Sequence, residues 1–361
     1  MTTLRDIADG LRTTLDGGLR AAVVTVVATE GSVYRRAGAR CVVLEDGRII
    51  GVVSGGCVEK DLLEHAELVW ETGSGQLLEY DFRTPDDLIW GMGLGCNGAL
   101  KLWMQPLDLA LDAQTAGAWM ADMEDRDQCT SEYWVATILA SDDPAQVAAG
   151  GLVVLASDVG VAAGEGLTAL HVRGVPVRAF VERVAPRPRL LVFGAGDDAR
   201  SLVRQARMVD WHVSVIDHRP DWLTESRFPD ADERLLIRRD EYGIQPVHDY
   251  SFVISMTHNY ELDERVLQRM IFTPIPYLGM LGPRQRTDKM LTELAQAGRP
   301  VQPEAQTKLH APVGLDVGAE TPEEIAVGVV GEIIARKNQR EGGFLRARSG
   351  PIHPPHGPGH D

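Results

Sequence analysis

The chain has 361 residues, which is enough for two domains of ordinary size, each with its own core. With 44% hydrophobic and 24% charged residues, its composition is that of a globular protein. The 52 acidic residues outnumber the 36 basic ones, and the resulting net charge of −16 argues against a nucleic acid or an anionic membrane surface as the main partner.

The start of the chain predicts an amphipathic helix over 3–16, and its acidic residues argue against a signal peptide. No apolar run approaches the roughly 20 residues needed to cross a bilayer. Four cysteines without a C-x-x-C pair argue against a disulfide framework and a zinc ribbon, and they fit a reducing compartment. We therefore expect a cytoplasmic protein without a membrane span.

Strands and a basic loop follow the first helix. A β-branched run predicts a buried strand, and Asp46-Gly47 is a strong hairpin signal between two further strands. These predicted strands cover 21–29, 41–45 and 48–53. Between the first two lies a loop, 30–38, that carries Arg35 and Arg36. This loop follows the end of a strand, so both arginines could hold an anion there, or they could be ordinary solvated loop charges.

The hairpin runs into Ser54-Gly55-Gly56-Cys57, which a helical apolar pattern follows. This places Cys57 at a helix start, where unpaired N–H groups and the helix dipole favour anions and lower the pKa of a thiol. The glycines allow a ligand to approach the backbone closely, so Ser54, Gly55 and Gly56 are candidate ligand contacts. The alternative is that Cys57 is a small buried hydrophobe and the glycines only form a turn.

A second glycine-rich loop, 91–98, carries Cys96. Two glycine-flanked thiols in one domain suggest a site for a soft metal or a sulfur atom, with Cys57 as the contact and Cys96 in support. The other two cysteines fit other roles, because Cys41 belongs to a predicted strand and Cys129 to a polar surface stretch.

The best domain boundary lies at 185–189, where two prolines end the preceding structure. We therefore expect a domain over 1–186, a second over 187–340 and a disordered tail over 341–361 that is rich in Gly, Pro, Arg and His. Before the boundary, the remaining predicted elements are strands at 77–82, 99–105, 134–140, 152–156 and 177–184 and a helix over 108–128.

The second domain opens with an apolar strand, the pattern Gly194-x-Gly196-x-x-Ala199 and an amphipathic helix. The next apolar run ends in Asp217, about 21 residues beyond Gly196, which is close to the spacing of a ribose-binding acid. In this context the pattern predicts a Rossmann-like, doubly wound parallel sheet.

Further strands are predicted at 234–237, 251–256 and 277–280. Since ligands of open α/β sheets bind beyond the carboxyl ends of the strands, candidate contacts gather in the loops there. The candidates are Gly194, Gly196, Asp217, His258 and Arg284. For the last two, a histidine with some other use and a plain surface charge are the alternatives.

These stretches together resemble the XdhC/CoxI family, the accessory factors of xanthine dehydrogenase and related molybdenum hydroxylases. The resemblance covers about 21–337. It is carried by Ser54-Gly55-Gly56-Cys57-Val58-Glu59, Gly93-Leu94-Gly95-Cys96, Gly194-Ala195-Gly196, Val215-Ile216-Asp217-His218-Arg219-Pro220, Met256-Thr257-His258, Gly279-Met280-Leu281-Gly282, and the run from His310 to Gly318 that leads into Thr321-Pro322-Glu323-Glu324.

The resemblance implies a mixed α/β N-terminal domain of the XdhC/CoxI type and a molybdenum cofactor chaperone. Such a protein binds the molybdenum cofactor (molybdopterin), protects it while a cysteine desulfurase helps to install the sulfido ligand, and delivers it to a xanthine dehydrogenase-like hydroxylase. In this chain, Cys57 would contact molybdenum or sulfur, and Arg35 would help to hold the phosphate. We also expect a homodimer.

The chain departs from the family pattern at some positions. Asp197 follows Gly-Ala-Gly where a histidine is frequent, and this acid would repel a pyrophosphate. Val33-Tyr34 replaces a common proline before Arg35, and Asn97 stands where a glycine is frequent. Two other functions stay open: an NAD(P)-dependent oxidoreductase with His258 as acid or base, and a scaffold between desulfurase and hydroxylase.

Overall fold

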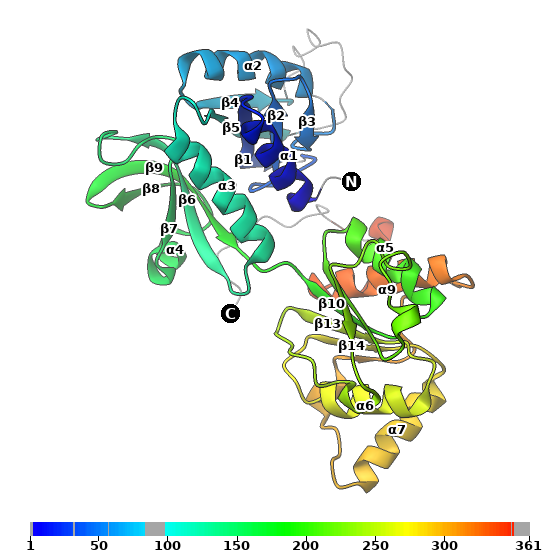
Figure 1. The fold of residues 1–361 in the computed structure, drawn as a ribbon. Helices are drawn as coiled ribbons and strands as arrows, with labels where there is room; N and C mark the ends of the chain where they lie inside the picture. Colours follow the sequence, from blue (N-terminus) through cyan, green and yellow to red (C-terminus); the bar gives the residue numbers. More distant parts are fainter. Residues whose placement is uncertain (1–2, 32, 57, 84–97, 348, 350–361) are drawn as a thin grey trace. The chain divides into compact units, whose positions relative to one another are not determined.

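The structure is a computed structural model that describes residues 3–31, 33–56, 58–83, 98–347 and 349. The chain splits into two compact units after Pro186, which we call the N-terminal unit and the C-terminal unit and describe separately (Figure 1). Within the described ranges, no helix is long and apolar enough to cross a membrane.

The N-terminal unit contains an antiparallel five-stranded sheet with the order β3-β2-β1-β5-β4. Its strands are β1 (Ala21–Gly31), β2 (Arg40–Leu44), β3 (Ile49–Gly51), β4 (Gln76–Asp81) and β5 (Gly98–Leu107). The predicted hairpin is confirmed, because β2 pairs with β3 around Gly47. The long central pair, β1 with β5, runs from Ala21 opposite Leu107 to Gly31 opposite Gly98.

Helices cover both faces of this sheet. The helix α2 (Glu59–Thr72) packs on one face, where Leu62 and Val69 meet alternate residues of β1 such as Val24. The helices α1 (Leu4–Asp16) and α3 (Ala113–Gln128) pack on the other face. Because successive strand residues point to opposite faces, the continuous apolar run of β1 serves both cores.

The helix predicted over 108–128 begins later than predicted. The Asp112 side chain accepts a hydrogen bond from the Thr115 amide at 3.0 Å and so caps α3 at Ala113. Asp108 accepts from the amides of Ala110 and Leu111, which folds the preceding residues into a turn.

A second antiparallel sheet of the N-terminal unit has the order β7-β6-β9-β8. Its strands are β6 (Tyr133–Ser141), β7 (Leu152–Leu155), β8 (Gly166–Val172) and β9 (Val175–Val184), and α4 (Ser157–Ala163) lies between β7 and β8. The sequence did not predict α4 or β8. The edge strand β8 alternates half-buried and exposed residues, so it contains no continuous apolar run.

A buried ion cluster joins β2, α3 and β9. Glu182 pairs with Arg40 and accepts from Arg126 at 2.8 Å, and Arg126 also donates to Asp122 at 2.6 Å. All four side chains are at most 10% exposed. Burial favours a protonated Glu182, but the two guanidinium groups outweigh it and hold the pKa of this carboxyl below its usual value.

The C-terminal unit is built on a parallel six-stranded sheet with the order β12-β11-β10-β13-β14-β15. The strands are β10 (Arg189–Phe193), β11 (His212–Asp217), β12 (Glu233–Leu236), β13 (Ser251–Ser255), β14 (Tyr277–Met280) and β15 (Leu309–His310). The order reverses between β10 and β13, which makes their carboxyl ends the topological switch point. The predicted Rossmann-like doubly wound fold is confirmed.

Helices cover both faces of the parallel sheet. On one face lie α5 (Asp197–Met208) and α9 (Pro322–Lys337), whose apolar residues form one core with the strands. On the other lie α6 (Tyr260–Met270) and α7 (Arg284–Gln296). A short helix, α8 (Pro303–Gln306), precedes β15. A capping box begins α9, with the Thr321 side chain accepting from the Glu324 amide.

One prediction for this unit was wrong in its local structure. Arg284 was expected in a loop, but it is the first residue of α7, which follows Pro283. The Gly-Pro pair signals a turn, yet a proline at the edge of a helix also favours its start. Of the tail, the structure describes 341–347 and 349, in which Leu345–Ala347 form a short 3-10 turn.

Candidate functional site

The first candidate region is the turn before α2, which we call the Ser54 turn and define by residues 54–56, 58 and 59. The Ser54 hydroxyl lies 2.9 and 2.8 Å from the two carboxylate oxygens of Glu59. It also accepts hydrogen bonds from the amides of Gly56, at 3.2 Å, and Val58, at 3.4 Å. Ser54 is only 3% exposed, so this hydroxyl is the internal anchor of the turn.

The basic loop lies against the Ser54 turn. A Cβ at Gly55 would stand 3.7 Å from Cδ2 of Tyr34, so the tyrosine ring packs directly over this glycine. The ring itself is 65% exposed, and the neighbouring Arg35 is half-buried. Of the predicted site residues, the structure thus brings Ser54, Gly55 and Gly56 close to the segment that carries Arg35.

The predicted metal or sulfur contact Cys57 and its supporting Cys96 lie outside the described residues. The helix beside Cys57 begins at Glu59, with Val58 as the N-cap. Of the two described cysteines, Cys41 is buried in β2, and burial raises the pKa of its thiol. Burial also raises the pKa of the half-buried Cys129 thiol. No group of three His, Cys, Asp or Glu side chains among the described residues could hold a metal ion.

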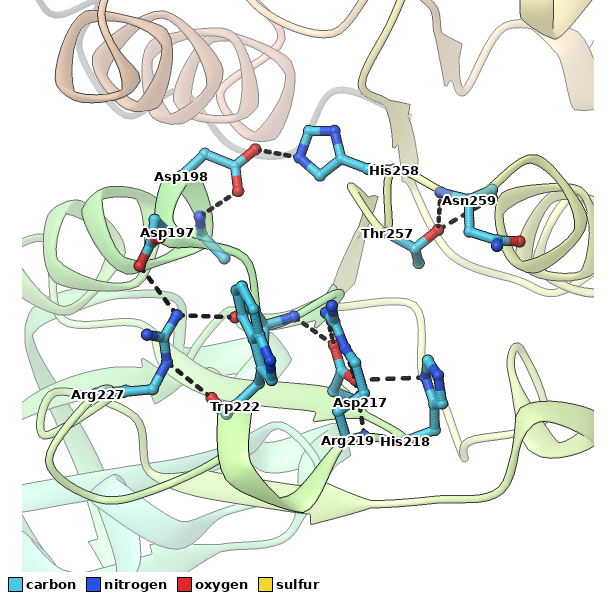
Figure 2. A network of polar contacts seen from close by, with 12 residues as sticks. Asp197, Asp198, Asp217, His218, Arg219, Trp222, Arg227, Thr257, His258 and Asn259 are labelled. Atoms are coloured by element: carbon cyan, nitrogen blue, oxygen red, sulfur yellow. Dashed lines mark hydrogen bonds and ion pairs between the residues drawn. The ribbon is translucent and has the colours of Figure 1, made fainter.

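The second candidate region is the network of polar side chains at the switch point, beyond the carboxyl ends of β10, β11 and β13 (Figure 2). We call this region the crevice, after the usual ligand position in such sheets. Gly194 follows β10 with a φ of +115°, and a Cβ there would stand 2.5 Å from the carbonyl oxygen of Met256. Only glycine therefore lets the loop after β13 come this close. This contact brings the predicted residues Gly194, Gly196 and His258 together.

Asp217 is the third predicted residue in the crevice. One carboxylate oxygen accepts from the Ala195 amide at 2.7 Å, and both oxygens accept from the Arg219 guanidinium. Burial would raise the pKa of this carboxyl, but these hydrogen bonds outweigh it and lower the pKa. The sequence predicted a ribose-binding acid, whereas in the structure Asp217 holds the glycine-rich turn of its own chain.

Sequence reasoning missed Asp198, which reaches across the crevice. Its Oδ2 lies 2.7 Å from Nε2 of His258, and its Oδ1 accepts from the Ala199 amide at 3.0 Å. Asp198 is the second residue of α5, a position where the helix dipole favours a carboxylate. An acidic residue at the start of a predicted helix was the sequence feature that could have identified Asp198. The carboxylate therefore stands where a bound pyrophosphate would meet the helix in a dinucleotide-binding protein.

The loop that carries His258 is bound to α6 by the buried side chain of Asp263. Asp263 accepts from the hydroxyls of Ser255, at 2.6 Å, and Thr257, at 2.8 Å, and from Arg286 at 2.6 Å. His258, next to Thr257, has a left-handed backbone conformation, with φ of +57°. A charged residue inside the apolar face of α6 was the only sequence signal for Asp263.

Two arginines and a tryptophan border the crevice (Figure 2). The Trp222 ring lies between the guanidinium groups of Arg219, at 4.5 Å, and Arg227, at 4.7 Å. Arg227 also pairs with Asp197 at 3.0 Å, so this acid is turned away from His258. The predicted Arg284 is exposed at the start of α7.

Two family models match the chain. The model of the XdhC and CoxI family matches residues 14–81, and that of the XdhC Rossmann domain matches residues 190–333.

Two curated relatives are similar over most of their length. A protein of Bacillus subtilis (strain 168), named as a probable xanthine dehydrogenase subunit, is 32% identical over 338 residues, which cover 88% of this chain and 94% of that protein. The molybdenum cofactor insertion chaperone PaoD of Escherichia coli (strain K12) is 26% identical over 333 residues, which cover 92% of this chain and 88% of that protein.

A solved structure has the same fold. It is a crystal structure described as a xanthine dehydrogenase from Bacillus halodurans, with 28% sequence identity and a TM-score of 0.70. The similarity covers 92% of this chain and 96% of that one.

Proposed function

The chain belongs to the XdhC and CoxI family, and from this premise we propose that it is an accessory factor of a xanthine dehydrogenase-type molybdenum hydroxylase. Its cargo is the molybdenum cofactor, which it binds, protects while a cysteine desulfurase supports sulfuration, and delivers to the hydroxylase. The similarity to PaoD, a molybdenum cofactor insertion chaperone, supports this cargo. A homodimer is part of the proposal.

The observation that carries the proposal is the packing of Tyr34 over Gly55. This contact puts the half-buried Arg35 on the segment that borders the Ser54 turn. A guanidinium suits a phosphate group, and a cysteine thiolate suits molybdenum or sulfur. We therefore propose that Arg35 contacts the phosphate of the cargo and that Cys57 contacts its metal or carries its sulfur, with Cys96 in support.

The NAD(P)-dependent oxidoreductase has less support. The Asp217 carboxylate already accepts hydrogen bonds from the Ala195 amide and the Arg219 guanidinium. The Asp198 carboxylate lies at the start of α5, where it contacts His258. A dinucleotide would have to displace these groups and place its pyrophosphate beside an acid, which costs repulsion. His258 with Asp198 has the form of an oriented acid or base, but the described residues around it show no partner pair for hydride transfer.

The test is an anaerobic titration of the full chain with purified molybdenum cofactor, reading molybdenum and pterin bound per chain. We expect saturable binding by the wild type and at least tenfold weaker binding by Cys57→Ala and Arg35→Ala, since each substitution removes a charged or metal contact. Activation of the apo-hydroxylase should fall in the same variants.

Matched controls are available for both substitutions. Cys129→Ala removes a thiol far along the sequence, and Arg36→Ala removes the exposed neighbouring arginine; both should bind like the wild type. If the wild type does not bind the cofactor, the proposed function is wrong, and a titration with nicotinamide dinucleotides comes next. If Cys57→Ala binds the cofactor like the wild type and Arg35→Ala does not, the proposed cargo is supported and the proposed role of the thiol is refuted.

A further inference from the structure

The strands at the sheet borders differ in how well they are protected against pairing with another chain. Six described strands form these borders, and four of them, β3, β7, β12 and β15, are at most four residues long. A fifth, β4, carries the exposed acids Glu79 and Asp81. Short length and charged side chains are common protections of a sheet edge. The sixth, β8, is seven residues long, and its sequence GLTALHV contains no Asp, Glu, Lys, Arg or Pro.

The pairing of β8 with its neighbour β9 is regular. Consecutive pairs run from Gly166 opposite Val181 to Val172 opposite Val175, without a register shift. The two-residue turn between the strands, Arg173-Gly174, has φ angles of +52° and +82°, as a type I′ turn requires. β8 therefore also lacks a bulge, which would twist the edge away from a partner.

Three residues of β8 direct their backbone N–H and C=O groups away from β9. The pair that closes a two-residue hairpin exchanges hydrogen bonds, and from there hydrogen-bonded and non-hydrogen-bonded pairs alternate. The outward residues are therefore Leu167, Ala169 and His171, whose side chains are also exposed. Consistently, the carbonyl of Pro176, opposite His171, accepts from the Asp142 amide at 3.1 Å and so points away from β8. No described strand pairs with the outward groups.

The segment around β8 is complementary to a second copy of itself. When two copies pair in antiparallel orientation about Ala169, Leu167 of each lies opposite the partner's His171, and the outward N–H and C=O groups bond to one another. The same register places Glu165, exposed before the strand, opposite the partner's Arg173, exposed after it. The twofold symmetry repeats this charge pair. Moving the centre by one residue separates the two charges and turns the free backbone groups out of register.

We propose that β8 forms the interface of the homodimer. Two copies join their β8 strands edge to edge, in antiparallel orientation about Ala169, and so make one continuous sheet. The main-chain hydrogen bonds provide the affinity, and the two pairs of Glu165 with the partner's Arg173 fix the register. The inference rests on the homodimer of the proposed function, but it does not depend on the cargo. Since one strand pair is a small interface, the dimer dissociates on dilution.

The test is analytical ultracentrifugation of the full chain, without cofactor, over about a hundredfold range of protein concentration. We expect a monomer–dimer equilibrium for the wild type and about tenfold weaker association for Ala169→Pro, since proline removes a central outward N–H group. The thermal midpoint of this variant should stay close to that of the wild type, because this N–H group does not bond to β9 and an edge strand tolerates proline there. The matched control, Ala169→Ser, keeps the N–H group and should associate like the wild type.

A charge exchange tests the register. Arg173→Glu should weaken association about tenfold, because it places two acids opposite each other, and adding Glu165→Arg to it should restore association. The matched control is Arg48→Glu, which changes an exposed arginine beside the β2-β3 turn and should leave association unchanged. Hydrogen exchange should be slowed at the outward amides of β8 only at concentrations where the wild type is a dimer.

The outcomes separate this interface from the cargo. The inference is refuted if Ala169→Pro associates as tightly as the wild type, which would place the dimer interface on another surface, or if the exchanged charges do not restore association. A wild type that stays monomeric at every concentration also refutes it and would leave the edge to a strand of a different protein. A chain that dimerises through β8 but does not bind molybdenum cofactor refutes the cargo and supports the interface.

Discussion

At the scale of single residues, Asp217 stabilises the C-terminal unit with one buried carboxylate. It accepts from the amides of Ala195 and Arg219 and from the guanidinium of Arg219, and it is 1% exposed. These donors lower its pKa in the folded state. In the unfolded chain the pKa returns to about 3.9. Between the folded and the unfolded pKa, the unfolded state therefore binds more protons than the folded state. The free energy of unfolding falls as the pH falls from the unfolded pKa through the folded pKa.

We expect Asp217→Asn to lower the free energy of unfolding by about 1–3 kcal/mol at neutral pH, because hydrogen bonds to a charged acceptor are lost. The difference from the wild type should be constant above about pH 5 and shrink as the pH falls below about 4, since the unfolded wild type then takes up a proton that the folded carboxylate resists. Urea unfolding at each pH measures it. Asp221→Asn, at an exposed neighbouring position, is the control. A difference that stays constant with pH would contradict this explanation.

At the scale of elements, the ion cluster around Glu182 ties β2, α3 and β9 together. We expect Glu182→Gln to cost about 3–5 kcal/mol, because it leaves the buried guanidinium groups of Arg40 and Arg126 without their shared charge. The matched control is Glu132→Gln, whose pair with Arg183 is about half exposed and whose loss should cost less than about 1 kcal/mol. Chemical unfolding compares the two. Equal effects would mean that burial does not set the strength of this cluster.

The elements also show what the sequence could predict. Continuous apolar runs and glycine signals predicted β1, β10, β13 and the β2-β3 hairpin, because burial on both faces leaves a clear pattern. The edge strand β8 was missed because exposed residues interrupt its apolar pattern. The helix α7 was missed because Gly282-Pro283 indicates a turn as well as a helix start.

The candidate site, like the fold, was predictable only in part. The rule that ligand loops follow the carboxyl ends of parallel strands brought Gly194, Gly196 and His258 together correctly. The partners Asp198 and Asp263 were not predicted, because their contacts join residues 60 and 8 positions apart through the tertiary fold. The roles of Cys57 and Cys96 stay predictions from the sequence and the family resemblance.

At the scale of the whole molecule, the chain consists of two compact units that divide after Pro186, each with its own sheets and cores. We expect calorimetry to show two unfolding transitions, since each unit has an independent core. Glu182→Gln should lower only one of them. Gly194→Ala should lower only the other, because a Cβ at position 194 would clash with the Met256 carbonyl oxygen. If either substitution moves both transitions equally, the units unfold as one.

The stacking of Trp222 between two guanidinium groups has an optical consequence. Of the two tryptophans in the C-terminal unit, Trp211 is 3% exposed and packs against Phe252, whereas Trp222 is 37% exposed. Within this unit, an external quencher therefore acts mainly on Trp222, whose flanking cations attract iodide. The fluorescence of this indole is an intrinsic reporter of the crevice: a ligand that displaces Arg227 from Asp197 alters the cation beside the ring and changes the emission without any added label.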